Sequence, residues 1–266
     1  MLYLALTLWP LGDIGRAVSL VSDAEARIAG LAHVGTRAMG RMHAGLFELM
    51  RGDLSRAAQN AVELARLTRE HELPMWQAFG VFLEGAGRPD SGEPFDGLDG
   101  MRRGVELLRE QKVLFFDVLV RIALAEAEAR AGDVERAIAT IDEALETVDR
   151  TGCRTFEAEL HRVSGEMILK RDRANFPPAE EALHTAIAIA KQQAARSFSL
   201  RAALSLAKLY RSTGRPVEAH AVLAPALEGL SPTPEMPEIA EAQALLEHLA
   251  RGSEGAIASK DQATEG

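Results

Sequence analysis

The chain has 266 residues, of which 47% are hydrophobic and 26% charged, so it can bury a large core. Aromatic residues make up only 5% while alanine and leucine abound, which favours helix packing over a β-sandwich. The formal net charge of −9 argues against a surface built to neutralise phosphates, so we expect no direct nucleic-acid partner.

The first predicted helix covers residues 1–11 and is almost entirely apolar. It carries no basic region, so it does not resemble a secretory signal, and the chain has no run of 18 apolar residues that could span a bilayer. Cys153 is the only cysteine, which excludes an intramolecular disulfide; we expect it to be a small buried side chain. These features predict a cytoplasmic chain with no membrane partner.

This first helix also looks cut short. It begins without a capping residue and has fewer residues than any later helix in the same position of the pattern. A solenoid normally ends in a repeat with a polar outer face, so this end would leave apolar surface exposed. We therefore predict that upstream domains of a longer parent, or a partner chain, dock on the truncated N-terminal helix.

A turn signature then recurs with a period of 40 residues. It consists of a glycine, usually followed by aspartate, with a small residue such as Ala17, Ala57 or Ala137 five positions later. The glycine stands where a helix C-terminus requires a positive φ, and the small residue would let neighbouring helices approach closely. The turns fall at residues 12, 52, 92 and 132 and then, after a longer loop, near 172 and 214.

Between the turns, apolar residues recur at helical spacing, so each repeat is predicted to be a helix, a turn and a second helix. The expected repeats are approximately 1–30, 35–71, 74–111, 114–150, 154–194 and 197–229, with a capping helix at 236–251. Together they form a predicted repeat domain over residues 1–251. The predicted helices are 1–11, 15–30, 35–51, 54–71, 74–86, 97–111, 114–131, 134–150, 154–171, 178–194, 197–213, 216–229 and 236–251.

Two segments depart from this regularity. Pro89 and the glycines around it should end the preceding helix early and leave a mobile loop over residues 85–96. The C-terminal segment 252–266 is small and polar, and we predict that it is a disordered tail.

The run from Leu206 through Tyr210 to Gly214, followed by Ala219 and Ala226, resembles the tetratricopeptide (TPR) pattern of a small pair, an aromatic, a turn glycine and spaced alanines. The usual TPR period is 34, so helices in a 40-residue repeat must be longer by about a turn each. We predict an all-α fold: a right-handed TPR-like superhelical solenoid of about six helical hairpins plus a C-terminal capping helix.

Residues 151–166 resemble part of the C-terminal TPR region of bacterial multidomain class III adenylate/guanylate cyclase–AAA ATPase signalling proteins. Segments 71–76, 179–190 and 197–203 support this likeness, which spans roughly residues 1–250. The resemblance implies a role in regulating or scaffolding a cyclase or an ATPase. The chain has no GxxxxGK[ST] phosphate loop and no segment matching the cyclase domain, so we expect neither enzyme activity nor a cofactor.

The residues that could carry other chemistry are too scattered to form a site. No two histidines stand four apart as zinc ligands would on a helix, and the pair Glu157 and His161 has no third ligand. Paired carboxylates such as Glu180 and Glu181 fall on predicted solvent faces, and no GxSxG motif is present. No catalytic, cofactor-binding or metal-binding residue is predicted.

The remaining candidate site is the concave groove that the first helices of the repeats should line. We expect it to be apolar towards the N-terminus and charged towards the C-terminus, which suits a partner segment with one apolar and one charged end. Packing between helices explains the methionine equally well. The predicted partner-binding residues are Met42, Leu46, Leu49, Glu126, Arg162, Glu166, Lys208 and Arg211.

The sequence thus predicts a non-catalytic interaction or regulatory module that binds a protein or peptide segment in its groove. Its leading interpretation is the TPR part of a cyclase/ATPase signalling protein. The alternatives are an effector-sensing TPR arm of an ATPase-type transcriptional regulator and a stand-alone TPR adaptor. An enzyme on a helical scaffold would need a convergent acid, base or metal set, which the sequence does not offer.

Overall fold

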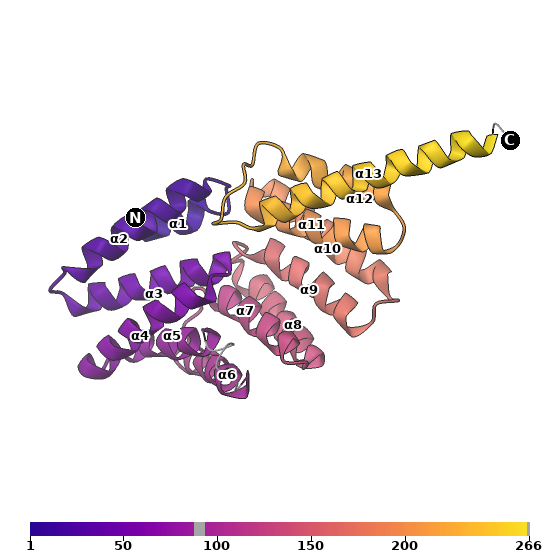
Figure 1. Ribbon diagram of the computed structural model, residues 1–266. Helices are drawn as coiled ribbons and strands as arrows, with labels where there is room; N and C mark the ends of the chain where they lie inside the picture. Colours follow the sequence, from indigo (N-terminus) through magenta and orange to yellow (C-terminus); the bar gives the residue numbers. More distant parts are fainter. Residues whose placement is uncertain (88–93, 265–266) are drawn as a thin grey trace.

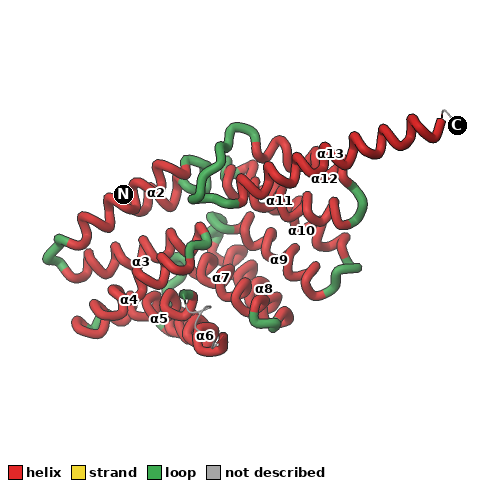
Figure 2. Tube along the Cα trace, viewed as in Figure 1, coloured by secondary structure: helices red, strands yellow, loops and turns green. Residues whose placement is uncertain are grey.

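The computed structural model describes residues 1–87 and 94–264, and within these ranges the chain forms thirteen helices and no β-strand (Figures 1 and 2). The helices are α1 (Leu2–Leu8), α2 (Ile14–Ala29), α3 (Val34–Arg51), α4 (Leu54–His71), α5 (Pro74–Ala86), α6 (Pro94–Glu110), α7 (Asp117–Arg130), α8 (Val134–Thr151), α9 (Glu157–Arg171), α10 (Phe176–Gln192), α11 (Arg196–Ser212), α12 (Pro216–Leu227) and α13 (Glu238–Thr264).

Consecutive helices pair as antiparallel hairpins, from α1 with α2 to α11 with α12. The odd-numbered helices also pack on one another in sequence. The even-numbered helices pack mainly on their neighbours in the chain, and Arg56 and Asn60 of α4 also reach Glu25 of α2. The odd-numbered helices therefore form the inner layer and the even-numbered helices the outer layer. This arrangement confirms the predicted all-α, TPR-like fold of sequential hairpins.

The turn signature is explained by the different backbone roles of two adjacent residues. Gly12, Gly52 and Gly132 have φ values of +91°, +87° and +93°, which a residue with a Cβ adopts only with strain. The aspartate that follows begins the next helix: Asp53 accepts a hydrogen bond from the backbone N–H of Arg56 at 3.0 Å, and Asp133 does the same in its repeat. The predicted turn at Gly92 lies outside the described residues.

The predicted close approach of helices is confirmed most sharply between α5 and α6. A Cβ added to Gly104 would lie 2.6 Å from the Cβ and 2.8 Å from the Cα of Phe82, and one added to Gly85 would lie 2.5 Å from the carbonyl oxygen of Gly97. Both contacts involve backbone that cannot move aside independently of its helix. The two helices can therefore pack at this distance only if these positions are glycine.

Replacing Gly104 with alanine should lower the free energy of unfolding by about 1 to 3 kcal/mol, because the added methyl group overlaps the α5 backbone. Gly15 in α2 is the matched control, since nothing lies within 4 Å of a Cβ placed there, and G15A should leave stability equal or slightly higher. Urea unfolding of the two variants measures both effects. Equal stability of G104A and the unmodified protein would contradict the close packing.

Several boundaries differ from those predicted. Helix α1 ends at Leu8, and α6 already begins at Pro94, while residues 88–93 of the predicted 85–96 loop lie outside the described residues. Helix α13 continues to Thr264, past the predicted end of the capping helix at residue 251 (Figure 1). Residues 254–264 include alanine, glutamate, lysine and glutamine, which propagate a helix that has already been nucleated.

Cys153 is exposed rather than buried. It follows Gly152, whose φ of +70° ends α8, and therefore lies in the connection to α9 outside the packed helices.

The first two hairpins also meet the sixth, which the repeat pattern does not predict. The backbone N–H and the hydroxyl of Ser197 in α11 donate to the carbonyl oxygens of Pro10 and Trp9, at 2.9 and 2.6 Å. Arg201 donates to the carbonyl oxygens of Met50 and Arg51 at the end of α3, at 3.0 and 3.2 Å. A simple solenoid contacts only sequential neighbours, so we call this contact between distant repeats the seam.

Candidate binding pocket

A pocket of about 350 Å³ lies beside the seam, on the inner layer of the fold. Its walls come from the C-terminal end of α3, from α7, α9 and α11, and from the start of α13. The volume is at the lower end of the range for ligand pockets, with room for a few residues of a peptide. The apolar part of the lining is formed by Leu49, Leu119, Ile122, Phe156, Phe198 and Leu204.

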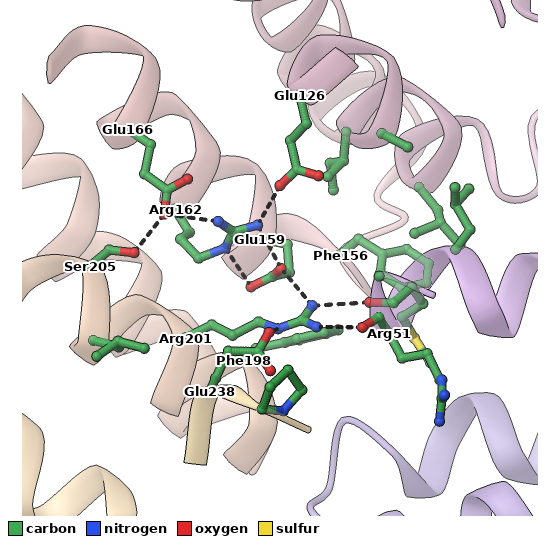
Figure 3. A pocket seen from close by; sticks show the side chains of 18 of the residues that line it. Arg51, Glu126, Phe156, Glu159, Arg162, Glu166, Phe198, Arg201, Ser205 and Glu238 are labelled. Carbon is green, nitrogen blue, oxygen red and sulfur yellow. Dashed lines mark hydrogen bonds and ion pairs between the residues drawn. The ribbon is translucent and has the colours of Figure 1, made fainter. Parts of the chain in front are cut away.

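Arg162 lies at the centre of the polar part, with only 10% of its side chain exposed (Figure 3). Its guanidinium donates to Glu159 at 3.0 and 3.1 Å, to Glu126 at 2.9 Å and to Glu166 at 2.9 Å. Spacing on α9 brings three of these residues together, because positions 159, 162 and 166 share one helical face. A buried arginine surrounded in this way has its charge neutralised from three directions.

The Arg162 charge also affects the acids around it. Burial raises the pKa of Glu166. The Arg162 guanidinium and the hydroxyl of Ser205, which donates to Glu166 at 2.6 Å, lower this pKa by more than burial raises it, so the net shift is downwards. The pKa of Arg162 itself is raised, since the three carboxylates outweigh its burial. Arg162 and Glu166 therefore both carry their charge at neutral pH.

Arg201 forms the floor between the pocket and the seam (Figure 3). Besides the two α3 carbonyls it pairs with Glu238 at 2.8 Å and Glu159 at 3.4 Å, and its guanidinium carbon lies 4.6 Å from the ring centre of Trp9. Glu159 thus connects the two arginines. One side chain holds together the first, second and sixth hairpins and the start of the capping helix.

A second buried network lies behind Arg51, at the rim of the pocket. The carboxylate of Glu48 is 2.8 Å from Nε of Arg51 and 3.2 Å from Nε of Arg56, and the residue is 1% exposed. Burial raises the pKa of Glu48 to about 7, against the opposing charges of the two arginines. Arg51 also pairs with Asp53 at 3.0 Å and with Glu235.

The raised pKa of Glu48 predicts a pH-dependent stability. Below 4.5, its unperturbed value, both folded and unfolded states are protonated; between 4.5 and about 7 only the unfolded state ionises, so folding weakens as the pH rises. This loss amounts to about 3 kcal/mol. Glutamine does not titrate, so E48Q should lack this loss of stability. The free energy of unfolding of wild type, relative to that of E48Q, should therefore fall by about 3 kcal/mol between pH 4.5 and 7.5.

Urea unfolding of both proteins at several pH values measures this difference. The histidines with lowered pKa values, His43 and His161, titrate in the same window but occur in both proteins, so their effect cancels. A difference that stays constant with pH would contradict the raised pKa.

Of the predicted partner-binding residues, the structure brings Leu49, Glu126, Arg162, Glu166 and Lys208 to the pocket. Met42 and Leu46 lie instead in the core, 1% and 0% exposed, which corresponds to the helix-packing alternative. Met42 lies two turns and Leu46 one turn before Leu49 on α3, a helix that α1 and α5 cover. Arg211 is exposed and lies outside the pocket lining.

Sequence reasoning missed the pocket residues Arg201, Glu159, Phe156 and Phe198. Two of them had a usable signal: Arg201 stands seven positions before Lys208, and Glu159 three before Arg162, each on the face already assigned to the groove. The seam had no signal, because no local pattern links residues about 150 positions apart.

The outer side of α1 exposes apolar side chains, as the sequence predicts. Met1, Tyr3 and Leu4 are 44%, 63% and 43% exposed, and no side chain caps the helix. The Tyr3 ring packs edge-on against buried His43 at 4.4 Å, and His43 contacts Phe116 at 5.6 Å. The exposed face of α1 thus continues into aromatic packing on α3 and the start of α7.

Two features are absent from the described residues 1–87 and 94–264. None of their helices is long and apolar enough to cross a membrane. No group of three or more histidine, cysteine, aspartate or glutamate side chains among them could hold a metal ion.

No protein-family model and no curated protein matches the chain. Solved structures do match its fold. A Rap protein complexed with Competence and Sporulation Factor superposes with a TM-score of 0.66 at 14% identity, covering 88% of this chain and 62% of the Rap chain. The apo form of RapI gives 0.57 at 15%, covering 99% and 77%. This chain therefore spans less than two thirds of the first of these proteins.

A third match is a signal transduction ATPase with numerous domains (STAND) that carries a tetratricopeptide repeat sensor, PH0952 from Pyrococcus horikoshii. Its TM-score is 0.55 at 13% identity, over 93% of this chain and 38% of that protein. At these identities the comparisons establish a shared TPR-like fold only.

Proposed function

We propose that the chain is a non-catalytic interaction module whose pocket holds a segment of a partner protein or peptide. The observation that carries the proposal is the pocket itself: a recess in the inner helical layer with apolar walls and a buried, fully paired polar centre. The polar centre is rigid before any partner arrives, which reduces the entropy lost on binding. The matching Rap protein was itself solved in complex with Competence and Sporulation Factor, which supports a binding role for a fold of this kind.

A pocket-filling variant tests this proposal. Ala123 lines the pocket from α7, so A123W should fill much of its volume, whereas Ala188 is exposed on α10 and A188W adds the same ring outside. We expect linear heptapeptides selected from a displayed library on the intact chain to bind wild type and A188W equally. Their affinity for A123W should fall at least 10-fold. Selected peptides that bind all three proteins equally would refute the pocket as the binding site.

We further propose that the module belongs to a larger signalling protein. The sequence likeness supports a cyclase/ATPase parent, and the STAND protein with a TPR sensor supports an ATPase joined to such repeats. An effector-sensing arm of an ATPase-type transcriptional regulator and a stand-alone adaptor are the alternatives. The reading frame upstream of Met1 distinguishes them: cyclase and ATPase motifs favour the first, a helix-turn-helix favours the regulator, and neither favours the adaptor.

The exposed side of α1 is the proposed contact with those upstream domains or with a partner chain. Replacing Tyr3 with glutamate would place a charge in that contact while leaving the buried side of α1, with Ala5 and Trp9, intact. Light scattering of the isolated chain would then report self-association that Y3E removes. An isolated chain that is monomeric, and that binds upstream domains as well with Y3E as without it, would refute the contact.

A further inference from the structure

The hydrogen-bond donors of the pocket arginines are almost fully used within the protein. Arg162 directs four N–H groups at Glu126, Glu159 and Glu166. The N–H groups of Arg201 donate to Glu159, Glu238 and the two α3 carbonyl oxygens. A guanidinium has five such donors, so each arginine retains about one. An anionic ligand would have to displace existing ion pairs to bind here.

The acceptors, by contrast, face the pocket opening. The side chains of Glu126, Glu166 and Glu241 are 35%, 34% and 53% exposed, whereas those of Arg162 and Arg201 are 10% and 11% exposed. Arg162 thus lies beneath Glu126 and Glu166, with which it pairs (Figure 3), whereas Glu241 pairs at 2.7 Å with Lys208, whose side chain is 45% exposed. A carboxylate oxygen accepts more than one hydrogen bond, so these groups can still receive donors from a ligand.

The charges of the residues that line the pocket also favour a cationic ligand. Five glutamates and four cationic side chains line the pocket. One of the cations, Arg51, is held from outside by Glu48, Asp53 and Glu235. Within the described part of the chain, Oε2 of Glu238 is buried without a hydrogen-bond partner, while its other oxygen pairs with Arg201 at 2.8 Å. With Arg51 held from outside, five glutamates face three remaining cations, Arg162, Arg201 and Lys208, so the lining has an excess of acidic groups.

The apolar walls restrict the shape of a suitable cation. Phe156, Phe198 and Leu204 lie beside the carboxylates, so an ammonium ion alone would leave them uncovered. A lysine or arginine side chain carries a charged head on an aliphatic stem and can satisfy both surfaces at once.

We propose that the pocket recognises a lysine or arginine side chain of an extended partner segment, with the stem against the apolar wall. Its head would lie beside Glu126 and Glu166 and take the place of Lys208 at Glu241. This inference rests on the proposed binding function and names the chemistry of its ligand. An acidic pocket in a chain of net charge −9 would also attract a basic segment from a distance.

The test uses the intact chain and heptapeptides selected on it from a displayed library. Selected peptides should be enriched in lysine or arginine, and fluorescence anisotropy should show at least 10-fold weaker binding when the key lysine is Nε-acetylated. E126Q/E241Q should weaken binding of the unmodified peptide to a similar extent. E135Q/E146Q makes the same change in net charge on the exposed face of α8 and should alter binding less than 2-fold.

The outcomes separate the two proposals. One outcome is that peptides lose binding to A123W but tolerate lysine acetylation, carry acidic residues, or bind through a free N-terminal amine. Such peptides would overturn the proposal of a lysine or arginine side chain and leave the pocket as a binding site. Peptides indifferent to A123W, or the absence of any enriched peptide, would count against both. If A123W does not fold, S205F blocks the same pocket from α11 and gives the same comparison.

Discussion

Replacing Arg162 with methionine should lower the free energy of unfolding by about 3 to 5 kcal/mol, a large part of the stability of a domain of this size. The side chain is held by Glu126, Glu159 and Glu166, and its removal would leave these carboxylates facing one another in a largely buried site. Methionine keeps most of the volume but none of the charge, so the loss reports on the ion pairs more than on packing. The melting temperature should fall on the order of 10 °C.

Thermal and urea unfolding measure this loss, and two further variants identify its origin. R103Q removes an arginine that pairs with Glu106 and Glu110 on the exposed surface of α6, and it should leave stability nearly unchanged. R162M/E159Q should recover part of the R162M loss, because one of the stranded carboxylates becomes neutral. Equal stability of R162M and wild type would mean that the three-way pairing contributes no net free energy.

The fold could be predicted because its determinants are local and repeated. A turn glycine with positive φ, an aspartate that caps the next helix and a small residue one turn later recur together, so Gly52, Asp53 and Ala57 already define a hairpin. The helix boundaries were less certain at the termini. There α13 continues past residue 252, because helix propagation needs only compatible residues once a helix exists.

The site was predictable only in part, for a physical reason. Alignment of the repeats from their turns placed Arg162 and Glu166 in the groove, and both lie on one face of α9. Which face lies open to a ligand depends on contacts between repeats, and the same reasoning therefore placed Met42 in the groove although neighbouring helices bury it. Arg201 acts across the seam, and no periodic pattern encodes a contact between the second and sixth hairpins.

Replacing Arg201 with methionine should uncouple the first hairpins from the last. Arg201 donates to two carbonyls of α3 and pairs with Glu159 and Glu238, so its loss leaves buried acceptors on both sides of the seam without donors. Each buried acceptor left in this way costs about 1 to 3 kcal/mol. The total is comparable to that of R162M, but it should appear first at the seam.

Trp9 reports on the seam directly, because it is fully buried there beneath the Arg201 guanidinium. The chain has two tryptophans, so in a W76F background the fluorescence comes from Trp9 alone. With Arg201 present, urea unfolding followed by fluorescence and by far-ultraviolet circular dichroism should coincide. In R201M the fluorescence transition should come first, since the seam opens before the helices unfold.

R211M is the matched control, because Arg211 lies on the same helix but is exposed, and its two transitions should still coincide. Coincident transitions in R201M would show that Ser197, which bonds to the carbonyls of Trp9 and Pro10, holds the seam closed without Arg201. The same comparison bears on the pocket, since Arg201 is both its floor and the link across the seam. If the seam opens in R201M, the pocket loses the α3 wall, so peptides selected on wild type should lose affinity even though every glutamate at the entrance remains.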